Sequence, residues 1–428
     1  MRSAGASVRI VAACATAARQ RDPAVRRLAL MALVDGSGSG AFLAVSAIFF
    51  TRSVGLSIVE VGFGLALGGA LGLLTAVPVG ALADRYGPRR VLVVVSLWRA
   101  AGFAAFVLVH DLAGFLLVMC LLGVVQNAAP PLEQALVGRV VARAARVRTM
   151  AIMRAVRNVG FTVGALMGTL ALGLDARSAY VAIVVVNALS FVALAAMAAA
   201  LPVPTSAAAA LRRPLPLGVL RDRPYLLLAM LNAMLTIHWT LLSLGVPIWI
   251  AEHSNAPRAV IAPLLIVNTV LAVLFQVRAS RGADTIAGAA ARMRCGALAS
   301  AVCCAILAVV PSLPAAAAVA MLALGMIALT TGELFQSAGG WGLSYSLARE
   351  GDEAAYLSVF SLGSGLQQVT APIVVAAVVV AGASGWLALG ALLAVIGLAV
   401  PRSAQHAAAT RPALAAAIAH RASALPRT

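Results

Sequence analysis

The sequence predicts an all-α integral membrane protein with twelve transmembrane helices in two pseudo-symmetric six-helix bundles. Of its 428 residues, 62% are hydrophobic and only 11% are charged, and the mean hydropathy is +1.00. A soluble protein of this length could not bury so much apolar surface, so lipid must be the solvent for most of it. The apolar residues also form runs long enough to cross a bilayer, and most arginines lie between these runs.

Twelve apolar runs have the length of a membrane-spanning helix, about 20 residues. The first six lie near residues 28–51, 58–81, 91–109, 112–138, 149–172 and 179–200. The second six lie near residues 225–251, 259–279, 289–309, 316–337, 355–380 and 384–401. Between the two sets runs a segment rich in proline and arginine, which is typical of a linker. We therefore expect, in order, a cytoplasmic tail, a bundle, a cytoplasmic linker, a bundle and a cytoplasmic tail, at 1–27, 28–200, 201–224, 225–401 and 402–428.

The distribution of arginine predicts the orientation. All 32 basic residues are arginine, and the net charge is +18. On one side of the predicted topology the loops hold only Arg52, Arg177 and Arg258, whereas the tails and the loops on the other side are rich in arginine. Because arginine-rich loops stay in the cytoplasm, both termini are expected inside, in a cell (inner or plasma) membrane. Orientation also explains the positive charge better than nucleic-acid binding does, so we expect no nucleic-acid partner.

A short loop after the second run carries the most specific motif of the chain. It reads Gly80-Ala81-Leu82-Ala83-Asp84-Arg85-Tyr86-Gly87-Pro88-Arg89-Arg90. This spacing resembles the helix 2–3 loop signature of the major facilitator superfamily, G-x-L-A-D-R-x-G-x-R-R. The predicted spans, the two halves and the basic linker extend the resemblance over nearly the whole chain. The matching glycines and charged residues are Gly80, Asp84, Arg85, Gly87, Arg89 and Arg90.

The resemblance implies transport of a small molecule by alternating access, in which two bundles rock around a midplane cavity. In that scheme Asp84 lies near the start of span eleven, where a helix amino terminus favours negative charge. The arginines of the loop, Arg85, Arg89 and Arg90, would complete a cytosolic latch that holds one of the two end states.

Span five carries a second motif. Gly160, Gly164 and Gly168 are each four residues apart, and their surroundings resemble the antiporter signature G-x-x-x-G-P-x-x-G-G, with Ala165 in place of the proline and Thr169 in place of the last glycine. Such a stripe also allows ordinary close packing of two helices. Family members often carry an arginine in span four, and Leu122 to Asn127 contain none.

Ionisable groups inside a membrane are costly and are functional candidates by default. Asp35 is the clearest, because it lies about two turns into span one and is followed by Gly36-Ser37-Gly38-Ser39-Gly40. There it could bind and release a proton as the cavity changes sides. The alternative is a carboxylate held permanently by Arg99, Arg154 or Arg157.

Those three arginines lie within spans and cannot lose their charge. Arg154 and Arg157 share a helix face, because they are three residues apart. They could line the cavity and set the charge balance around Asp35, or they could extend to the cytosolic surface, which we favour for Arg154 and Arg157. For Arg99, which lies deeper, we favour the cavity.

Three further ionisable residues are weaker candidates for proton coupling or the cavity. We expect Glu133, near the inner end of span four, to pair with a loop arginine. Glu333, near the inner end of span ten, could act in gating or form an ion pair at the helix end. His238, in span seven, could bond substrate or titrate, although a histidine in a membrane span is more often packed and hydrogen-bonded.

Together these residues predict a secondary active transporter, with proton-coupled export of small, hydrophobic or amphipathic, drug-like molecules as the primary interpretation. Proton-coupled uptake of a small metabolite, a transport-inactive sensor or scaffold, and a membrane enzyme are the alternatives. We do not expect an enzyme, because the sequence shows no paired acids and no nucleophile–base motif. The expected partners are a small-molecule substrate, protons and the lipid bilayer. We expect a monomer with no metal and no cofactor, powered by the proton gradient.

Overall fold

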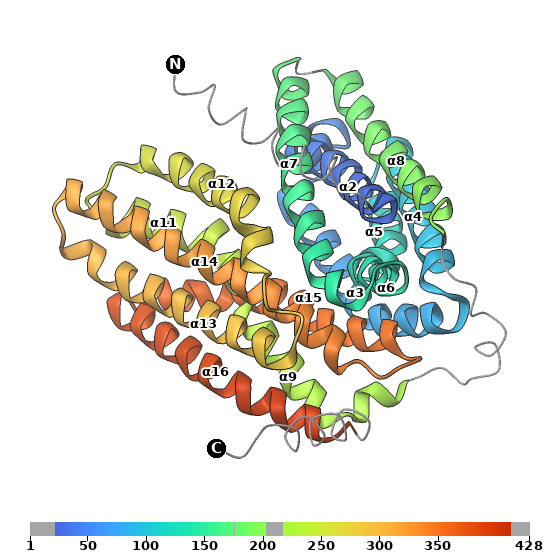
Figure 1. The fold of residues 1–428 in the computed structure, drawn as a ribbon. Helices are drawn as coiled ribbons and strands as arrows, with labels where there is room; N and C mark the ends of the chain where they lie inside the picture. Colours follow the sequence, from blue (N-terminus) through green and yellow to red (C-terminus); the bar gives the residue numbers. More distant parts are fainter. Residues whose placement is uncertain (1–21, 175, 203–216, 412–428) are drawn as a thin grey trace. The chain divides into compact units, whose positions relative to one another are not determined.

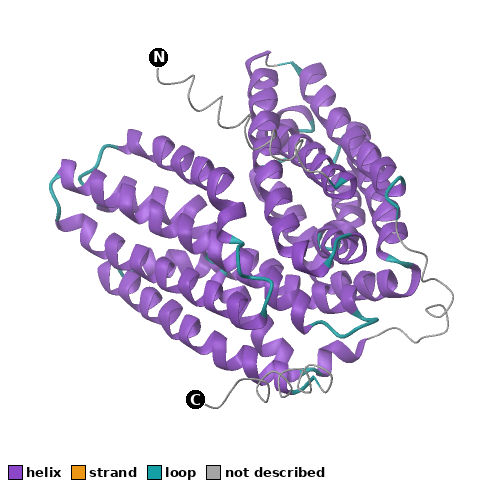
Figure 2. Cartoon of the chain, in the orientation of Figure 1, coloured by secondary structure: helices purple, strands orange, loops and turns teal. Residues whose placement is uncertain are grey.

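A computed structural model describes residues 22–174, 176–202 and 217–411, and this part of the chain contains helices and no strand (Figure 1, Figure 2). Eleven of its helices are long and apolar enough to cross a membrane. A twelfth span, α15 (Glu353–Val380), is bent by 41° between Glu353–Gln367 and Val369–Val380. The prediction of an all-α membrane protein is therefore confirmed, and the described part of the chain has the predicted twelve spans when the bent α15 is counted as one.

The chain divides into two compact units. The first comprises Met1–Leu217 with two short later segments, Ala272–Val277 and Glu350–Gly365. The second comprises Gly218–Leu271, Arg278–Arg349 and Leu366–Thr428. The two late segments fall within the second predicted bundle, yet they group with the first unit. Span eleven thus contributes its first turns to the first unit, where the loop signature lies.

In the first unit, six spans follow one another with short connections. They are α2 (Pro23–Ile48), α3 (Ile58–Tyr86), α4 (Pro88–Ala105), α5 (Leu112–Gln126) with α6 (Ala129–Val140), α7 (Arg146–Leu174) and α8 (Arg177–Ala199). Span four, predicted as one run, is interrupted at Asn127 and Ala128. The interruption precedes Pro130 and Pro131, which are tolerated in the first turn of α6 because the amides there have no partner inside the helix.

In the second unit, span seven is the irregular one. It consists of α9 (Arg223–Leu235), the single turn α10 (His238–Thr240) and α11 (Val246–His253). A π-helical turn, Leu241–Gly245, precedes α11. The remaining helices are α12 (Ile261–Ala279), α13 (Ile286–Val309), α14 (Ala315–Leu347), α15 and α16 (Ala383–Ala409).

Several helix ends depart from the predicted spans, and at two helix starts a capping aspartate lies at the new boundary. Asp22 accepts a hydrogen bond from the Ala24 amide at 2.8 Å, so α2 begins at Pro23, inside the predicted tail 1–27. Asp222 caps α9 in the same way, two residues before the predicted end of the linker. At the other end, α16 continues to Ala409, beyond the predicted boundary at residue 401. Residues 1–21, 203–216 and 412–428, which include most of the predicted tails and linker, lie outside the described residues.

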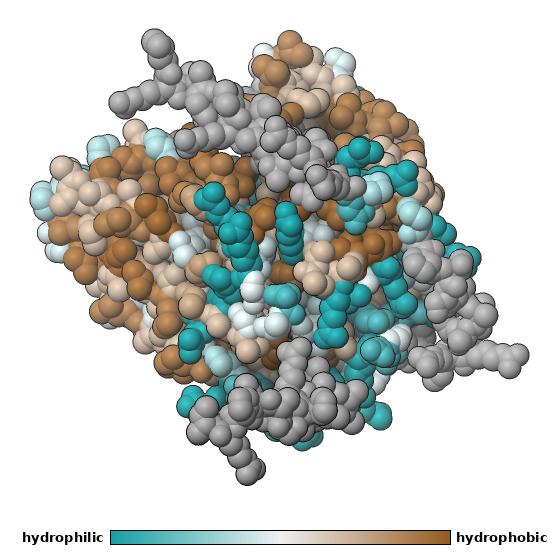
Figure 3. Space-filling view, in the orientation of Figure 1, coloured by the Kyte–Doolittle hydropathy of each residue, from teal (hydrophilic) through white to brown (hydrophobic). Residues whose placement is uncertain are grey.

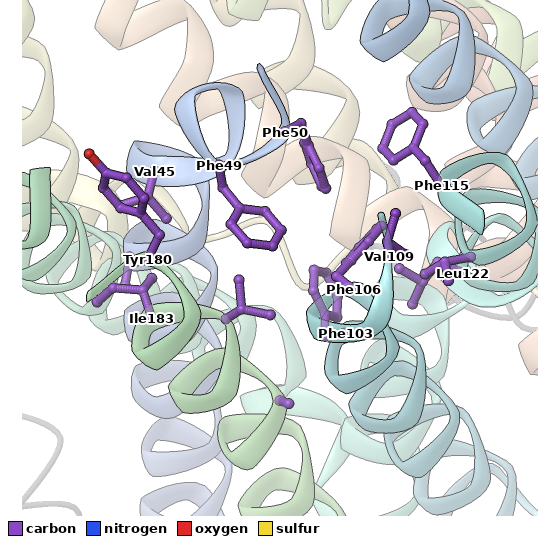
Figure 4. Packing of buried hydrophobic residues seen from close by; sticks show 14 of the residues in the cluster. Val45, Phe49, Phe50, Phe103, Phe106, Val109, Phe115, Leu122, Tyr180 and Ile183 are labelled. Atoms are coloured by element: carbon purple, nitrogen blue, oxygen red, sulfur yellow. The ribbon is translucent and has the colours of Figure 1, made fainter. Parts of the chain in front are cut away.

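Phenylalanine fills one end of the first unit (Figure 4). The rings of Phe50 and Phe115 lie 4.8 Å apart, and those of Phe42 and Phe103 lie 4.9 Å apart, both edge to face. These side chains come from α2, from the wider turn that follows it, from α4 and from α5. The outer surfaces are also apolar: brown side chains dominate the left of Figure 3, over α12, α13 and α16. This pattern is that of helices that face lipid.

Candidate functional site

Asp35 lies on the buried side of α2, immediately before Gly36, Gly38 and Gly40, whose lack of side chains lets other helices pack close to the α2 backbone. A side-chain carbon on Gly36 would collide with the Arg157 carbonyl of α7, and one on Gly40 would collide with the Phe161 carbonyl. On the neighbouring face, one on Gly38 would meet the Ser190 hydroxyl of α8. These glycines let α7 and α8 approach the α2 backbone closely, and this packing places Asp35 inside the bundle.

Asp35 belongs to a charged cluster that we define as Asp35, Arg99, Glu133 and Arg157. Arg157 Nε lies 3.2 Å from Asp35 Oδ2, and Arg99 Nη1 lies 3.7 Å from Asp35 Oδ1. Arg157 also donates a hydrogen bond to Glu133 Oε2 through Nη2. The four residues come from α2, α4, α6 and α7, and the side chain of Asp35 is only 11% exposed. Two carboxylates and two guanidinium groups make the ionised cluster neutral.

Arg99 is held from its other side by an aromatic ring. Its guanidinium carbon lies 3.9 Å from the centre of the Phe191 ring, which stacks on Phe103. Arginine over an aromatic face is attracted by the ring electrons, and the attraction strengthens away from water. The phenylalanine end of the first unit therefore adjoins the charged cluster.

The cluster corrects two sequence-based expectations. Glu133 forms an ion pair as expected, but its partner is Arg157 of span five and not a loop arginine. Arg157 lies between two buried carboxylates, so extension to the cytosolic surface does not describe its contacts. Arg154, one turn earlier on α7, is partly buried.

The glycine stripe of α7 packs against α2. A side-chain carbon on Gly160 would meet the Leu33 carbonyl, one on Gly164 the Ser37 carbonyl, and one on Gly168 the Ala44 side chain. In this structure the stripe therefore serves helix packing at the level of the charged cluster.

Substitution of Gly164 by alanine should destabilise the protein. The added methyl group would collide with the Ser37 backbone, which cannot move without shifting α2, and such overpacking costs roughly 1–3 kcal/mol. Gly173→Ala is the matched control, because the same helix leaves open space around Gly173. Thermal unfolding of the two purified variants checks the prediction, and equal midpoints would contradict it.

Asp84 lies where the resemblance placed it, at the amino terminus of span eleven. The amides of Ala354 and Ala355, in the first turn of α15, donate to Asp84 Oδ1 and Oδ2, each at 2.8 Å. One turn earlier on α3, a side-chain carbon on Gly80 would collide with Ser358 and the Ala354 carbonyl. The carboxylate thus satisfies two amides that have no partner inside their own helix, and its charge complements the helix dipole.

The other residues of the loop have different contacts. Gly87 adopts φ +90°, a left-handed conformation that favours glycine, and ends α3 immediately before Pro88. Arg89 donates to the Leu201 carbonyl at 2.8 Å, beyond the end of α8, and Arg90 is exposed. Arg85 lies 5.4 Å from the centre of the Tyr86 ring.

Inside the first unit, α15 also makes an ion pair with α6: Arg139 Nη2 lies 3.3 Å from Glu353 Oε2. Neither residue was among the sequence candidates. An arginine in the last turn of α6 and a glutamate in the first turn of α15 are ordinary helix-end residues, so nothing in the sequence links them.

In the second unit, Glu333 lies in the middle of α14 and not near a helix end, because α14 continues ten residues past the predicted boundary at 337. Asn268 of α12 donates to Glu333 Oε2 and to Thr330 Oγ1, both at 3.0 Å. His238 is buried, and its Nδ1 lies 2.9 Å from the Leu235 carbonyl, the packed arrangement typical of a histidine in a span. Asn268 was not among the residues expected at the site, although a carboxamide in an apolar run marks it in the sequence.

Within the described residues, no group of three or more histidine, cysteine, aspartate or glutamate side chains is placed to hold a metal ion. The site candidates are thus ion pairs and hydrogen-bonded polar groups inside helical bundles.

Comparisons with known proteins agree with this architecture. The chain is 29% identical over 215 residues to the multidrug resistance protein MdtH of Shigella sonnei (strain Ss046), covering 49% of this chain and 52% of MdtH. It is 24% identical over 133 residues to the uncharacterized MFS-type transporter YdeE of Escherichia coli (strain K12), covering 31% of this chain and 34% of YdeE. The aligned part thus spans about half or less of these relatives.

Solved structures share the fold over most of the chain. The crystal structure of the human organic anion transporter MFSD10 (TETRAN) matches with a TM-score of 0.63 at 16% identity, covering 89% of this chain and 100% of that one. A bacterial homologue of the iron transporter ferroportin, in an outward-facing state with soaked iron, matches with a TM-score of 0.70 at 16% identity, covering 90% and 98%. The family model described as Major Facilitator Superfamily matches residues 28–348, and the chain belongs to that superfamily of membrane transporters.

Proposed function

We propose that this transporter exports small, hydrophobic or amphipathic molecules, including drug-like compounds, in exchange for protons. The observation that carries the proposal is the charged cluster. It holds a buried carboxylate, Asp35, within reach of Arg99 and Arg157, on the glycine-rich stretch of span one. The similarity to the multidrug resistance protein MdtH supports export and the substrate class.

Protonation of Asp35 would change the charge of the cluster from zero to +1. The two ion pairs that join α2 to α4 and to α7 would then lose their attraction. Charge interactions are strong away from water, so one proton changes how firmly these three helices are held together. This is the physical requirement for a proton to drive alternating access.

We further propose that the transporter works as a monomer in the cell membrane, with both termini in the cytoplasm and with no cofactor beyond the proton gradient. The arginine-poor loops that contain Arg52, Arg177 and Arg258 support this orientation.

The test uses the full chain in liposomes with an imposed pH difference. The probes are ethidium, rhodamine 6G, norfloxacin and chloramphenicol, which cover cationic, zwitterionic and neutral amphiphiles. Exchange with protons predicts accumulation inside liposomes whose interior is acidic, above the level seen in protein-free liposomes. Accumulation only when the exterior is acidic would instead show proton-coupled uptake. The absence of protein-dependent accumulation for all four probes would contradict the proposal.

A further inference from the structure

We propose that Glu133 is a positioning residue that prevents Arg157 from locking Asp35 in its ionised form. Glu133 holds the guanidinium by a hydrogen bond, and Asp35 is thereby left free to take up and release a proton. The proposal rests on the proton coupling proposed above and concerns the same charged cluster.

The two carboxylates hold Arg157 in different ways. Glu133 accepts a hydrogen bond from Arg157 Nη2. Asp35 lies 3.2 Å from Arg157 Nε without hydrogen-bond geometry, and in the described part of the chain neither that Nε nor Asp35 Oδ1 has a hydrogen-bond partner. A hydrogen bond between ionised groups is roughly twice as strong as one between neutral groups, and Asp35 makes no such bond with Arg157. The Arg157 guanidinium is therefore hydrogen-bonded to Glu133 and acts on Asp35 only through its charge.

The other groups near Asp35 do not take over the role of Glu133, which is to hold Arg157 by a hydrogen bond. Arg99 of α4 lies 3.7 Å away, and its Nε also has no hydrogen-bond partner within the described residues. Where α8 packs on α2 next to Gly38, it presents the uncharged side chains of Asn187 and Ser190. Arg154 lies one turn from Arg157 on the same face of α7. Asp35 is thus the carboxylate of the cluster whose ionised form has the fewest hydrogen bonds.

If Glu133 lost its charge, Arg157 would be drawn to Asp35 instead of Glu133. Arg157 would then have one carboxylate in reach, Asp35, and the cluster would hold two guanidinium groups against one acid. An opposite charge within about 4–6 Å favours the ionised carboxylate by about 1–3 pH units. The ionised form of Asp35 would then be favoured more strongly than it is in the wild-type protein.

The test is an infrared titration of the purified full-length protein, which needs no substrate. The carboxylic-acid band that disappears in Asp35→Asn reports protonation of Asp35. In Glu133→Gln we expect the midpoint of this band to move by at least about one pH unit towards acid. Glu133→Asp, which keeps the charge, should move it less than Glu133→Gln does.

The double variant Glu133→Gln/Arg157→Gln distinguishes positioning from a merely structural role. It leaves Asp35 and Arg99, so the cluster is neutral again and the midpoint should return towards the wild-type value. An unchanged midpoint in Glu133→Gln, or a double variant that keeps the acid shift, would overturn the proposal. If Glu133→Gln does not fold, Arg157→Gln alone must move the midpoint in the opposite direction, towards alkaline pH, and its failure to do so would be equally decisive.

The two proposals fail separately. Proton-coupled flux with an unshifted titration in Glu133→Gln would refute the role of Glu133 and leave the transport function intact. A shifted titration in a protein that couples no flux to protons would refute the transport mechanism and leave the chemistry of the cluster intact.

Discussion

Asp35→Asn should abolish proton-driven transport while the protein remains folded and inserted. Asparagine has nearly the same shape as aspartate, but its side-chain amide does not take up a proton near neutral pH. No proton can therefore be exchanged at this position. Loss of a proton-transferring side chain typically lowers a rate by on the order of 100-fold or more. The measurement is flux of the four probes into liposomes with an acidic interior.

The structure gives a reason to expect that this variant folds. Removing one partner of a buried ion pair is damaging when it leaves a lone charge. Here Arg157 keeps its hydrogen bond to Glu133, and Arg99 keeps the ring of Phe191. The asparagine oxygen can still accept a hydrogen bond from either guanidinium group.

Asp111→Asn is the matched control. It makes the same chemical change at an exposed position, where the side chain caps α5 by accepting from the Gly114 amide at 2.8 Å, and asparagine caps a helix equally well. Wild-type flux in Asp111→Asn with none in Asp35→Asn is the expected pair of results. Normal pH-driven flux in Asp35→Asn would show that another residue carries the proton, or that Asp35 is a permanent ion-pair partner.

The second large effect is expected at Asp84. Asp84→Asn should slow the transport cycle far more than it weakens substrate binding. The carboxylate accepts from two amides of α15 with separate oxygens, whereas asparagine offers one oxygen and no charge. Hydrogen bonds to a charged group contribute about 1.5–3 kcal/mol. If that loss destabilises only one of the two end states, the rate at which the transporter converts between them changes by roughly ten- to hundredfold.

Initial rates at several probe concentrations separate the two effects. The maximal rate should fall by that factor, and the half-saturating concentration should change less than about twofold, a difference below 0.5 kcal/mol. Glu353→Gln is the control in the same turn of α15. Its pair with Arg139 is partly exposed, with both side chains 38% accessible, and such pairs contribute less than about 1 kcal/mol. Weakened binding with an unchanged maximal rate in Asp84→Asn would contradict the latch.

The charged cluster illustrates the limit of sequence reasoning about the site. Each of its four members was recognisable alone, because an ionisable group in an apolar run is unusual. The sequence also named Arg99 and Arg157 as possible partners of Asp35, and both lie next to it. The pairing of Glu133 with Arg157 was not recognisable, because the two residues lie 24 positions apart on separate helices. The assignment of Glu133 to a loop arginine failed for this reason: proximity along the chain says little about which helix faces meet.

The sequence by itself determined the membrane fold, the spans and the position of Asp84. Hydropathy over about 20 residues reflects the thickness of the bilayer, which is a local property of the chain. The contact of Asp84 with span eleven joins residues 270 positions apart, and only the resemblance of the loop motif to the family signature predicted it. Only the tertiary structure decided which charges meet, that Glu333 lies in the middle of its helix, and that the first turns of α15 group with the first unit. The meeting of the charges depends on glycines such as Gly36 and Gly164, which set how closely two helices approach. The place of Glu333 depends on α14 continuing past its apolar run to Leu347.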